Sequence, residues 1–419
     1  MRARGPSSGS SSADDQRPAA DDRAAVIQVL AEAGCFDRWG VVPSGCSLTT
    51  LGGSVGGTYR ATVDLGSAGG EHGSDVGTPT CSVVVKLAAA SEVARARHAG
   101  EAHGLEALRR TGSVRVPGVL AVGRTVRRDV LVMEDLAAPD GGWRSRGRRD
   151  PIRDPGPASD VDPSCDPGLS CEPDSSCDPD LSCDPDSSCD PDPWTRFGRS
   201  LAALHRASPP TVPAEGYGWS RDVWLGRTHI PAASAPTWPD HLERHRCTPL
   251  LRLAVQRGHV SARRAAGLGR RIDRLLLALP DHPARSLIHG DLWSGNTMLV
   301  PVRRAGAGGG AGGRLMSDAE SSDASRSGST PVTDGHRAKE VAIFDPAVCV
   351  ADAWAERAMM QLFGGIPSAA FVAWDQVLGR PDDAGIRLAA GQLVHALNHL
   401  AIFGPSYLDL VDRTLAAQP

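Results

Sequence analysis

The sequence predicts an α+β protein of two lobes, a β-rich N-terminal lobe followed by a mostly helical C-terminal lobe. Three observations lead to this prediction. The chain has 419 residues, of which 41% are hydrophobic, so it exceeds one compact domain and can bury a sizeable core. Residues 51–135 contain runs of β-branched residues separated by glycines, whereas amphipathic helical patterns dominate from residue 194 onward. The polar stretches beside these regions have almost nothing to bury, and we expect disordered inserts there.

The polar stretches define the organisation of the chain. We expect a disordered tail at 1–22, an N-terminal lobe at 23–136, an insert at 140–193 and a C-terminal lobe at 194–419. The C-terminal lobe contains a Gly/Ser-rich segment at 303–339 with the composition of a flexible loop.

The insert at 140–193 contains a repeat of six residues, beginning SCDPGL and SCEPDS. Its cysteines are Cys165, Cys171, Cys177, Cys183 and Cys189. Thiolates beside carboxylates can ligate soft metal ions, which is one interpretation of the repeat. The density of Asp and Pro, the lack of histidine and a spacing unlike that of structural zinc sites favour a disordered insertion instead.

Composition also narrows the partners and the compartment. With 45 basic and 49 acidic residues, the net charge of −4 gives no case for binding a nucleic-acid backbone. No apolar run reaches 18 residues, and the first 22 residues lack the apolar stretch of a signal peptide. We therefore expect a cytoplasmic protein that binds neither nucleic acid nor membrane. Outside the repeat, cysteines such as Cys35, Cys81 and Cys349 are expected to be buried free thiols.

The N-terminal lobe is predicted from residues 51–135. A candidate strand at 59–64 precedes a second strand, CSVVVK, which ends at Lys86, and residues 92–110 have a helical pattern that includes Glu101. Lys86 has two interpretations: an amine that reaches solvent from the end of a buried strand, or the partner of Glu101 in an ion pair across the lobe. Such an ion pair fixes a lysine on the α and β phosphates of ATP.

Two further features of this lobe fit a nucleotide site. The turn LGGSVGGTYR provides Gly52 and Gly53, whose positive φ angles would let backbone amides approach phosphates closely. The run DVLVMEDL at 129–136 has the character of an edge strand that leads into a linker. Glu134 lies in this hinge, where adenine can bond to backbone groups, so we count it among the ATP-binding candidates.

The C-terminal lobe is expected to be helical around 194–207, 255–280 and 384–403. Between the last two segments, SLIHGDLWSGNTMLVPV predicts a strand, a tight polar loop and another strand, and VAIFDPAV predicts a strand that stops at an aspartate. Phosphoryl transfer needs a carboxylate that accepts the hydroxyl proton and oxygen ligands for Mg²⁺. The spacing of five residues from Asp291 to Asn296 matches a loop in which the aspartate faces the nucleophile and the asparagine faces the metal. Asp345 is the second metal-ligand candidate.

Simpler interpretations exist for two residues of this region. Asp345 precedes a proline and is also typical of a turn or a helix start, and His289 can be a loop histidine that holds the loop backbone. The combination of HGDLWSGN with a strand ending in FDP favours the catalytic interpretation.

These motifs resemble the fructosamine kinase (ketosamine kinase) family, which has the aminoglycoside-phosphotransferase type of protein-kinase-like fold. The resemblance rests on HGDLWSGN, IFDPAV, LFGG at 362–365 and LNHLAIFG at 397–404, and it extends upstream through FGRSLAALH and EAHGLEAL. It implies Asp291 as base, Asn296 and Asp345 as Mg²⁺ ligands, Lys86 with Glu101 on ATP, and Trp293 as a wall of the substrate pocket. The implied activity is phosphorylation of a sugar hydroxyl in a ketosamine, either a free glycated amine or a glycated protein, with a role in deglycation.

The chain departs from the family pattern in three places. At 351–360, ADAWAERAMM has Trp354 where the family has an acid that could hold the active-site loop or the substrate amine. At 226–234, Ile230 and Ala232 replace the expected glutamine and asparagine. The glycine turn lacks the cysteine that gives some relatives a redox switch. We therefore expect a remodelled substrate pocket and no such switch.

Two other functions stay open from the sequence. The same scaffold can phosphorylate another acceptor, such as an aminoglycoside or amino-sugar compound, which the departures at 226–234 and 351–356 would permit. A nucleotide-binding module without catalysis, acting through its inserts, is the alternative of another class. The joint presence of Lys86, Asp291, Asn296 and Asp345 argues against this second alternative.

Overall fold

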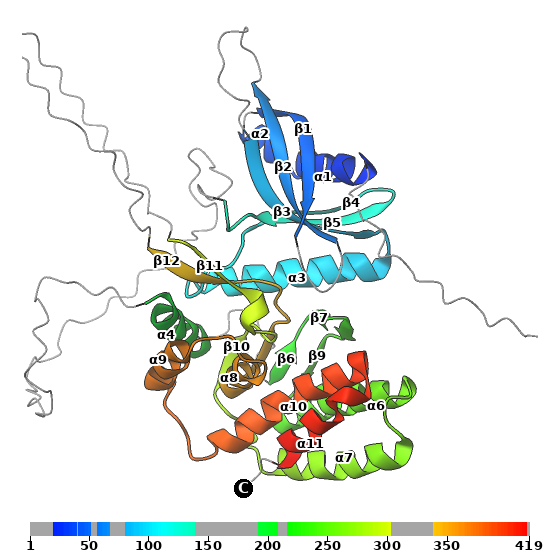
Figure 1. Cartoon of the computed structure of the whole chain (residues 1–419), viewed down its shortest axis with the longest axis vertical. Helices are drawn as coiled ribbons and strands as arrows, with labels where there is room; N and C mark the ends of the chain where they lie inside the picture. Colours follow the sequence, from blue (N-terminus) through cyan, green and yellow to red (C-terminus); the bar gives the residue numbers. More distant parts are fainter. Residues whose placement is uncertain are drawn as a thin grey trace, which may run out of the picture.

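The computed structural model describes residues 20–39, 41–51, 57–67, 80–138, 192–207, 216–302 and 338–416. It contains two lobes, with an antiparallel sheet above and a largely helical part below (Figure 1). The predicted α+β architecture is confirmed. The repeat at 165–189 and most of the Gly/Ser-rich segment lie outside the described residues.

Five antiparallel strands form the N-terminal sheet in the order β1-β2-β3-β5-β4. They are β1 (Val41–Thr50), β2 (Gly57–Ser67), β3 (Thr80–Ala89), β4 (Val119–Arg124) and β5 (Arg128–Glu134). The predicted edge strand at residues 129–136 is wrong, because β5 lies inside the sheet between β3 and β4. Residues 119–124 form β4, which pairs with β5 and covers its outer side.

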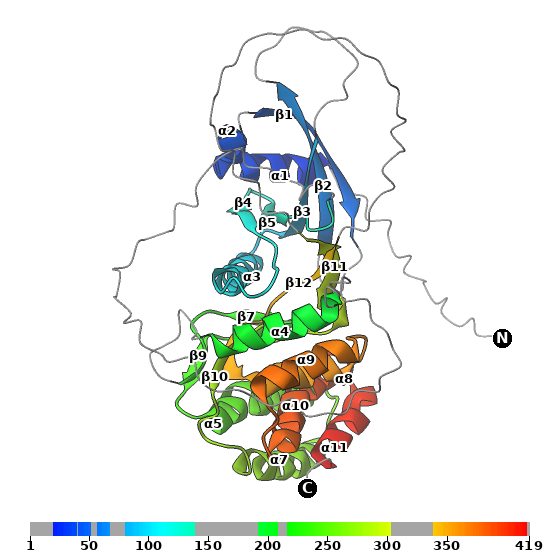
Figure 2. The ribbon, with the colours of Figure 1, turned by 90° about the vertical axis from the view of Figure 1, so that its left-hand side faces the viewer.

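Three helices belong to this lobe: α1 (Ala20–Glu32), α2 (Cys35–Trp39) and α3 (Glu92–Arg110). Helix α1 packs its apolar side chains against one face of the sheet in a core of its own. Helix α3 lies between the sheet and the second lobe in both ribbon views (Figures 1 and 2). Its Leu105 and Leu108 join a larger core that includes side chains of both lobes.

Strand alternation decides which way Lys86 points. Along β3, Cys81, Val83, Val85 and Leu87 are buried against the α1 side, so the residues between them face the opposite side of the sheet. Lys86 is one of these intervening residues and therefore points toward α3. The period of two in the sequence thus positions a cation at the cleft between the lobes.

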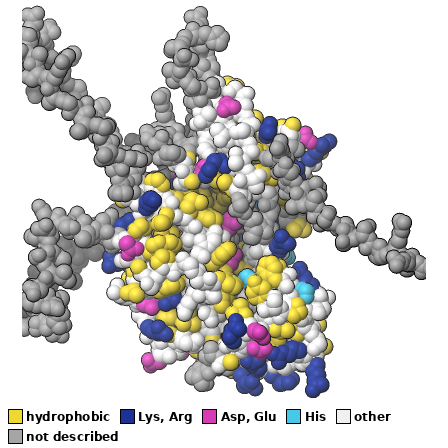
Figure 3. Space-filling model, in the orientation of Figure 1, with side chains coloured by type: hydrophobic (Ala, Val, Ile, Leu, Met, Phe, Trp, Pro, Cys, Tyr) yellow, Lys and Arg dark blue, Asp and Glu magenta, His cyan; other side chains and the backbone are white. Residues whose placement is uncertain are grey.

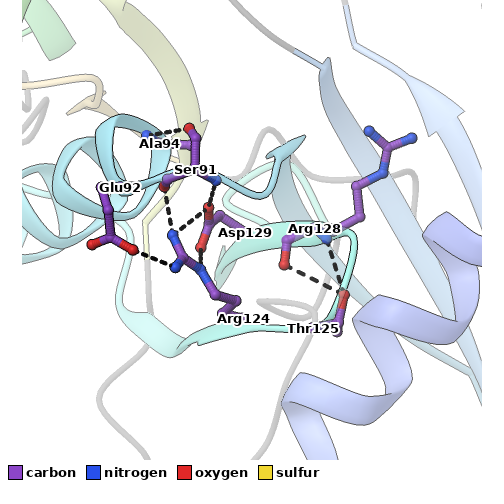
Figure 4. A network of polar contacts seen from close by, with 7 residues as sticks. All are labelled: Ser91, Glu92, Ala94, Arg124, Thr125, Arg128 and Asp129. Carbon is purple, nitrogen blue, oxygen red and sulfur yellow. Dashed lines mark hydrogen bonds and ion pairs between the residues drawn. The ribbon is translucent and has the colours of Figure 1, made fainter.

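A polar network fixes the start of α3 to the turn between β4 and β5 (Figure 4). Ser91 caps the helix by accepting a hydrogen bond from the Ala94 amide at 3.1 Å. The buried Asp129 carboxylate accepts from the Ser91 amide at 2.9 Å and from Arg124 at 2.7 and 3.1 Å. The helix that carries Glu101 is therefore held at its N-terminal end by charge-assisted hydrogen bonds.

The C-terminal lobe contains a small sheet of order β10-β13-β6-β9 and two hairpins, β7-β8 and β11-β12. Its strands are β6 (Tyr217–Trp219), β7 (Val223–Leu225), β8 (Thr228–Ile230), β9 (Ala233–Ala235), β10 (Arg285–Ile288), β11 (Thr297–Pro301), β12 (Lys339–Ile343) and β13 (Cys349–Asp352). The strand–loop–strand prediction for 286–302 is confirmed by β10 and β11.

Helices make up most of the lobe and lie beside and below strands β9 and β10 (Figure 2). They are α4 (Pro193–Arg206), α5 (Trp238–Leu242), α6 (Thr248–Gln256), α7 (Ala262–Leu277), α8 (Ala353–Leu362), α9 (Ser368–Leu378), α10 (Ala384–Phe403) and α11 (Leu408–Ala416). A π-helical turn, Glu243–Cys247, joins α5 to α6, and short 3₁₀ turns occur at Ser294–Asn296 and Pro405–Tyr407. Among the described residues, no helix is long and apolar enough to cross a bilayer.

Candidate active site

Four residues with predicted roles in phosphoryl transfer line one cavity. Lys86, Asp291, Asn296 and Asp345 line a space of about 80 Å³. The other residues that line it are Thr58, Arg97, Glu101, Trp224, Gly226, Trp293 and Pro346. On the face drawn in Figure 3, acidic side chains lie in the middle of the molecule, between the two lobes. The cavity therefore brings the predicted base, metal ligands and phosphate-binding lysine together.

Lys86 joins the two lobes at this point. Its Nζ lies 2.6 Å from Glu101 Oε1 on α3 and 2.6 Å from Asp345 Oδ1 on the loop after β12. Burial alone would lower the pKa of Lys86, but the charges of Glu101 and Asp345 outweigh burial and raise it. The lysine is thus a fixed positive charge, and the predicted Lys86–Glu101 ion pair is present.

The loop after β10 is held by hydrogen bonds within itself and to the loop after β12. The Asn296 Nδ2 atom donates to the Asp291 carbonyl at 2.9 Å, and the Ala347 amide donates to the His289 carbonyl at 2.8 Å. Gly290 has a φ of +81°, and a Cβ there would lie 2.1 Å from the Ala347 carbonyl oxygen. Glycine is required at 290 because the two loops touch through their backbones.

A second glycine of the loop positions Trp293. A Cβ at Gly295 would lie 2.3 Å from the Trp293 ring, so the indole lies directly over this residue. The ring also lines the cavity. The spacing of Trp293 and Gly295 in LWSGN thus gives the cavity an aromatic wall.

Asp291 is a mostly buried carboxyl group. Burial, together with the nearby charge of Asp345, raises its pKa to about 7. A carboxyl group with a pKa near neutrality is suited to accept and release a proton. Asp345 itself has a φ of +60°, which is uncommon for a residue other than glycine and marks a constrained loop position.

Sequence reasoning missed the residue that fixes this loop. Glu356 on α8 is fully buried, and its carboxylate accepts hydrogen bonds from the amides of His289 and Gly290, the latter at 3.2 and 3.3 Å. Burial raises the pKa of Glu356 to about 8, although the Leu292 amide also donates to it. An acidic residue among the apolar side chains of a buried helix was the signal that could have identified it.

The chain has Trp354 in place of the acid that was expected to hold the loop, but the loop is still held by an acid. Glu356, two residues later, is this acid, while Trp354 is buried and packs edge-on against Trp374 with 5.2 Å between ring centres. His289 is also fully buried. Its ring lies 2.9 Å from the Phe344 carbonyl oxygen and accepts from the Asp291 amide at 3.3 Å, which agrees with its interpretation as a loop-holding residue.

The remaining predicted nucleotide-binding residues are less informative. Gly52 and Gly53 lie outside the described residues. The Glu134 carboxylate binds Arg115 at 2.7 Å and the Gly118 amide at 3.2 Å, and the Glu134 amide donates to the Gly118 carbonyl. Its side chain and amide are thus occupied within the lobe.

Comparison with known proteins decides the family. The family model for fructosamine kinase matches residues 186–418, which is more than half of the chain and contains Asp291, Asn296 and Asp345. The chain belongs to the fructosamine kinase family. Lys86 and Glu101 lie N-terminal to the matched region.

Individual relatives are distant and only partly covered. A probable ketoamine kinase of Synechocystis is 28% identical over 223 residues, which are 53% of this chain and 61% of that protein. A probable ketoamine kinase of Thermus thermophilus is 24% identical over 224 residues, or 54% and 66% of the two chains. The matches thus span less than two thirds of these relatives of the fructosamine kinase family.

Solved structures agree with the fold over a longer range. A fructosamine-3-kinase candidate from Haemophilus somnus has a TM-score of 0.58 at 17% identity and covers 93% of this chain and 95% of its own. A second, from Thermobifida fusca, has a TM-score of 0.55 at 22% identity, with 93% and 98% coverage. The two-lobed fold is that of these structures.

Proposed function

We propose that this chain is an ATP-dependent kinase that phosphorylates a sugar hydroxyl of a ketosamine. The observation that carries the proposal is the single cavity lined by Lys86, Asp291, Asn296 and Asp345, because phosphoryl transfer depends on positioning and on charge stabilisation by such groups. Membership of the fructosamine kinase family supports it.

In this proposal, ATP lies between the lobes with its phosphates on Lys86. The ion pair with Glu101 keeps the ammonium group in place, and the network around Asp129 holds the helix that carries Glu101. The glycine turn at 52–53 would cover the phosphates, and the segment around Glu134 would approach the adenine.

The donor set suits magnesium, which prefers oxygen ligands and is commonly held by one or two protein groups plus substrate phosphates. The Asn296 amide nitrogen is engaged by the Asp291 carbonyl, so its amide oxygen is the atom available as a ligand. Asp345 contributes a carboxylate that is 45% exposed. The described residues include no cluster of three or more His, Cys, Asp or Glu side chains that would hold a metal ion alone. Bound there, Mg²⁺ would neutralise phosphate charge.

Asp291 is the proposed base. The acceptor hydroxyl oxygen forms a bond to the γ-phosphorus, the bond from that phosphorus to the β,γ-bridging oxygen breaks, and ADP leaves. The hydroxyl proton passes to the Asp291 carboxylate, which must be ionised to receive it. Glu356 and His289 act through the backbone by keeping Asp291 at the cavity wall.

The acceptor class follows from the family and from the aromatic wall. The relatives are described as ketoamine kinases and fructosamine-3-kinase candidates. Trp293 offers the flat apolar surface against which a sugar ring can pack. Phosphorylation of such an acceptor would place the chain in deglycation, on free glycated amines or on glycated proteins.

The test is ATP-dependent phosphorylation, with Mg²⁺, of a panel of fructosamine, ribulosamine and aminoglycoside acceptors. We expect a ketosamine to be phosphorylated by the parent and Asp291→Asn to lower kcat by at least about 10³-fold while ATP still binds. If only an aminoglycoside is phosphorylated, the proposed kinase activity stands and the proposed ketosamine acceptor is contradicted. ATP binding without any phosphorylation would contradict the proposal.

A further inference from the structure

Arg246 is a buried cation without an anionic partner in the part of the chain that the structure describes. It lies in the π-helical turn between α5 and α6 and is 9% exposed. Its guanidinium donates to the His245 carbonyl at 3.0 Å and approaches the Cys349 sulfur at 3.6 Å, but no described carboxylate lies within 4.0 Å of it. Burying an unpaired charge is costly, so such a group is expected where an anion binds.

Arg246 lines a second cavity, of about 50 Å³. His395 and Gly290 line the same cavity. His395 is 6% exposed, its Nδ1 has no hydrogen-bond partner among the described residues, and this atom lies 4.0 Å from Asp291 Oδ1. One water needs about 10–15 Å³, so the cavity accommodates a group of a few heavy atoms, such as a carboxylate.

The β7-β8 hairpin lies between the second cavity and the active-site cavity. Alternate residues of this hairpin face opposite sides: Trp224 and Gly226 line the active-site cavity, whereas Val223 and Leu225 line the cavity of Arg246. Asp291 and His395 meet at the same boundary. Asp291, where the proposed acceptor hydroxyl would lie, is therefore only one side chain away from the cavity of Arg246.

We infer that Arg246, with His395, forms a subsite for a carboxylate of the acceptor. This inference rests on the proposed function and narrows its substrate to ketosamines of free amino acids. In an amino acid glycated at its α-amino group, the carboxylate is attached to the carbon that carries the glycated nitrogen, only a few bonds from the sugar. A glycated lysine within a protein has no such carboxylate. The guanidinium fork binds a carboxylate through two parallel hydrogen bonds, a geometry that lysine cannot reproduce.

The experiment compares two acceptors of nearly equal size, N-fructosyl-glycine and N-fructosyl-glycinamide, in which a neutral carboxamide replaces the carboxylate. We expect the parent to prefer the carboxylate by about tenfold to hundredfold in kcat/KM, and Arg246→Gln to abolish this preference by lowering kcat/KM for N-fructosyl-glycine alone. Arg246→Lys should retain part of the preference. Arg252→Gln, at an exposed arginine of α6, is the matched control and should leave both values unchanged. Thermal melts establish that each variant is folded.

The outcomes separate this inference from the proposed function. Equal use of both acceptors by the parent, or an equal loss for both in folded Arg246→Gln, overturns the carboxylate subsite and leaves the kinase in place. If neither acceptor is phosphorylated, the ketosamine proposal fails, and calorimetric binding decides the subsite. Binding of N-fructosyl-glycine to the parent but not to Arg246→Gln supports the carboxylate subsite, whereas equal binding to both proteins contradicts it.

Discussion

At the scale of single residues, the site contains a lysine whose charged form is stabilised and an aspartate whose charged form is disfavoured. Lys86 is stabilised as a cation by two carboxylates, whereas burial and the charge of Asp345 act against ionisation of Asp291. The second effect is useful because a carboxylate that resists ionisation binds a proton readily. It also has a cost in stability, since the folded protein favours the protonated form.

This cost predicts a pH-dependent stability difference between the parent and Asp291→Asn. The folded pKa of about 7 lies above the ordinary value near 3.8, so ionised Asp291 destabilises the folded state increasingly between about pH 4 and 7. Asparagine removes this effect at similar volume. We expect the variant to be more stable than the metal-free parent, by about 3 kcal/mol more at pH 8 than at pH 5. Denaturant unfolding at both values measures this, and a difference independent of pH would contradict it.

At the scale of elements, helix α8 holds the loop after β10 in place through Glu356. Glu356 satisfies amides of a tight loop that has no regular secondary structure to pair with. The loop geometry is therefore set by a helix more than sixty residues away in sequence, through the hydrogen bonds that Glu356 accepts.

Removing this carboxylate should affect both stability and rate. Glu356→Ala leaves the amides of His289, Gly290 and Leu292 without their acceptor, and we expect the free energy of unfolding to fall by about 3 kcal/mol or more. A loop shift of about 1 Å would lower kcat on the order of 10²-fold. Glu356→Gln, which keeps one acceptor oxygen, should lie between the parent and the alanine variant. Urea unfolding and steady-state kinetics check this. An alanine variant with the kcat of the parent would show that the loop keeps its conformation without Glu356.

The elements also show what sequence could predict. The Lys86–Glu101 pair was predictable because strand and helix periods place both side chains on inward faces, and the loop from Asp291 to Asn296 because its spacing is local. Arg246 and His395 were not predictable. They belong to segments separated by about 150 residues, and only the packing of α10 against the π-helical turn brings them to one cavity.

At the scale of the whole molecule, strands β11 and β12 pair with each other although a long segment separates them in sequence. The β11-β12 hairpin pairs Pro301 with Lys339, and the Val302 amide donates to the Ala338 carbonyl at 2.8 Å. Val302 and Ala338 are thus neighbours in space although 35 residues separate them in sequence. Asp345 lies two residues after β12, the second strand of this hairpin.

This arrangement predicts that residues 303–337 can be removed. An Asn-Gly turn joining Val302 to Ala338 matches the two-residue hairpin register, so we expect kcat/KM to stay within about twofold. Shortening the loop should raise the free energy of unfolding by about 2 kcal/mol. Kinetics with ATP and the acceptor, and denaturant unfolding, measure these effects. A large loss of activity in a folded deletion variant would assign the segment a part in function.

The position of Lys86 between Glu101 and Asp345 has a thermodynamic consequence. One ammonium is shared by a carboxylate from each lobe, at 2.6 Å in both directions. A divalent cation that draws Asp345 away frees part of this charge for the nucleotide, and a nucleotide that engages Lys86 frees Asp345 for the cation. Nucleotide and cation would then bind cooperatively, and by reciprocity each would raise the affinity of the other by the same factor.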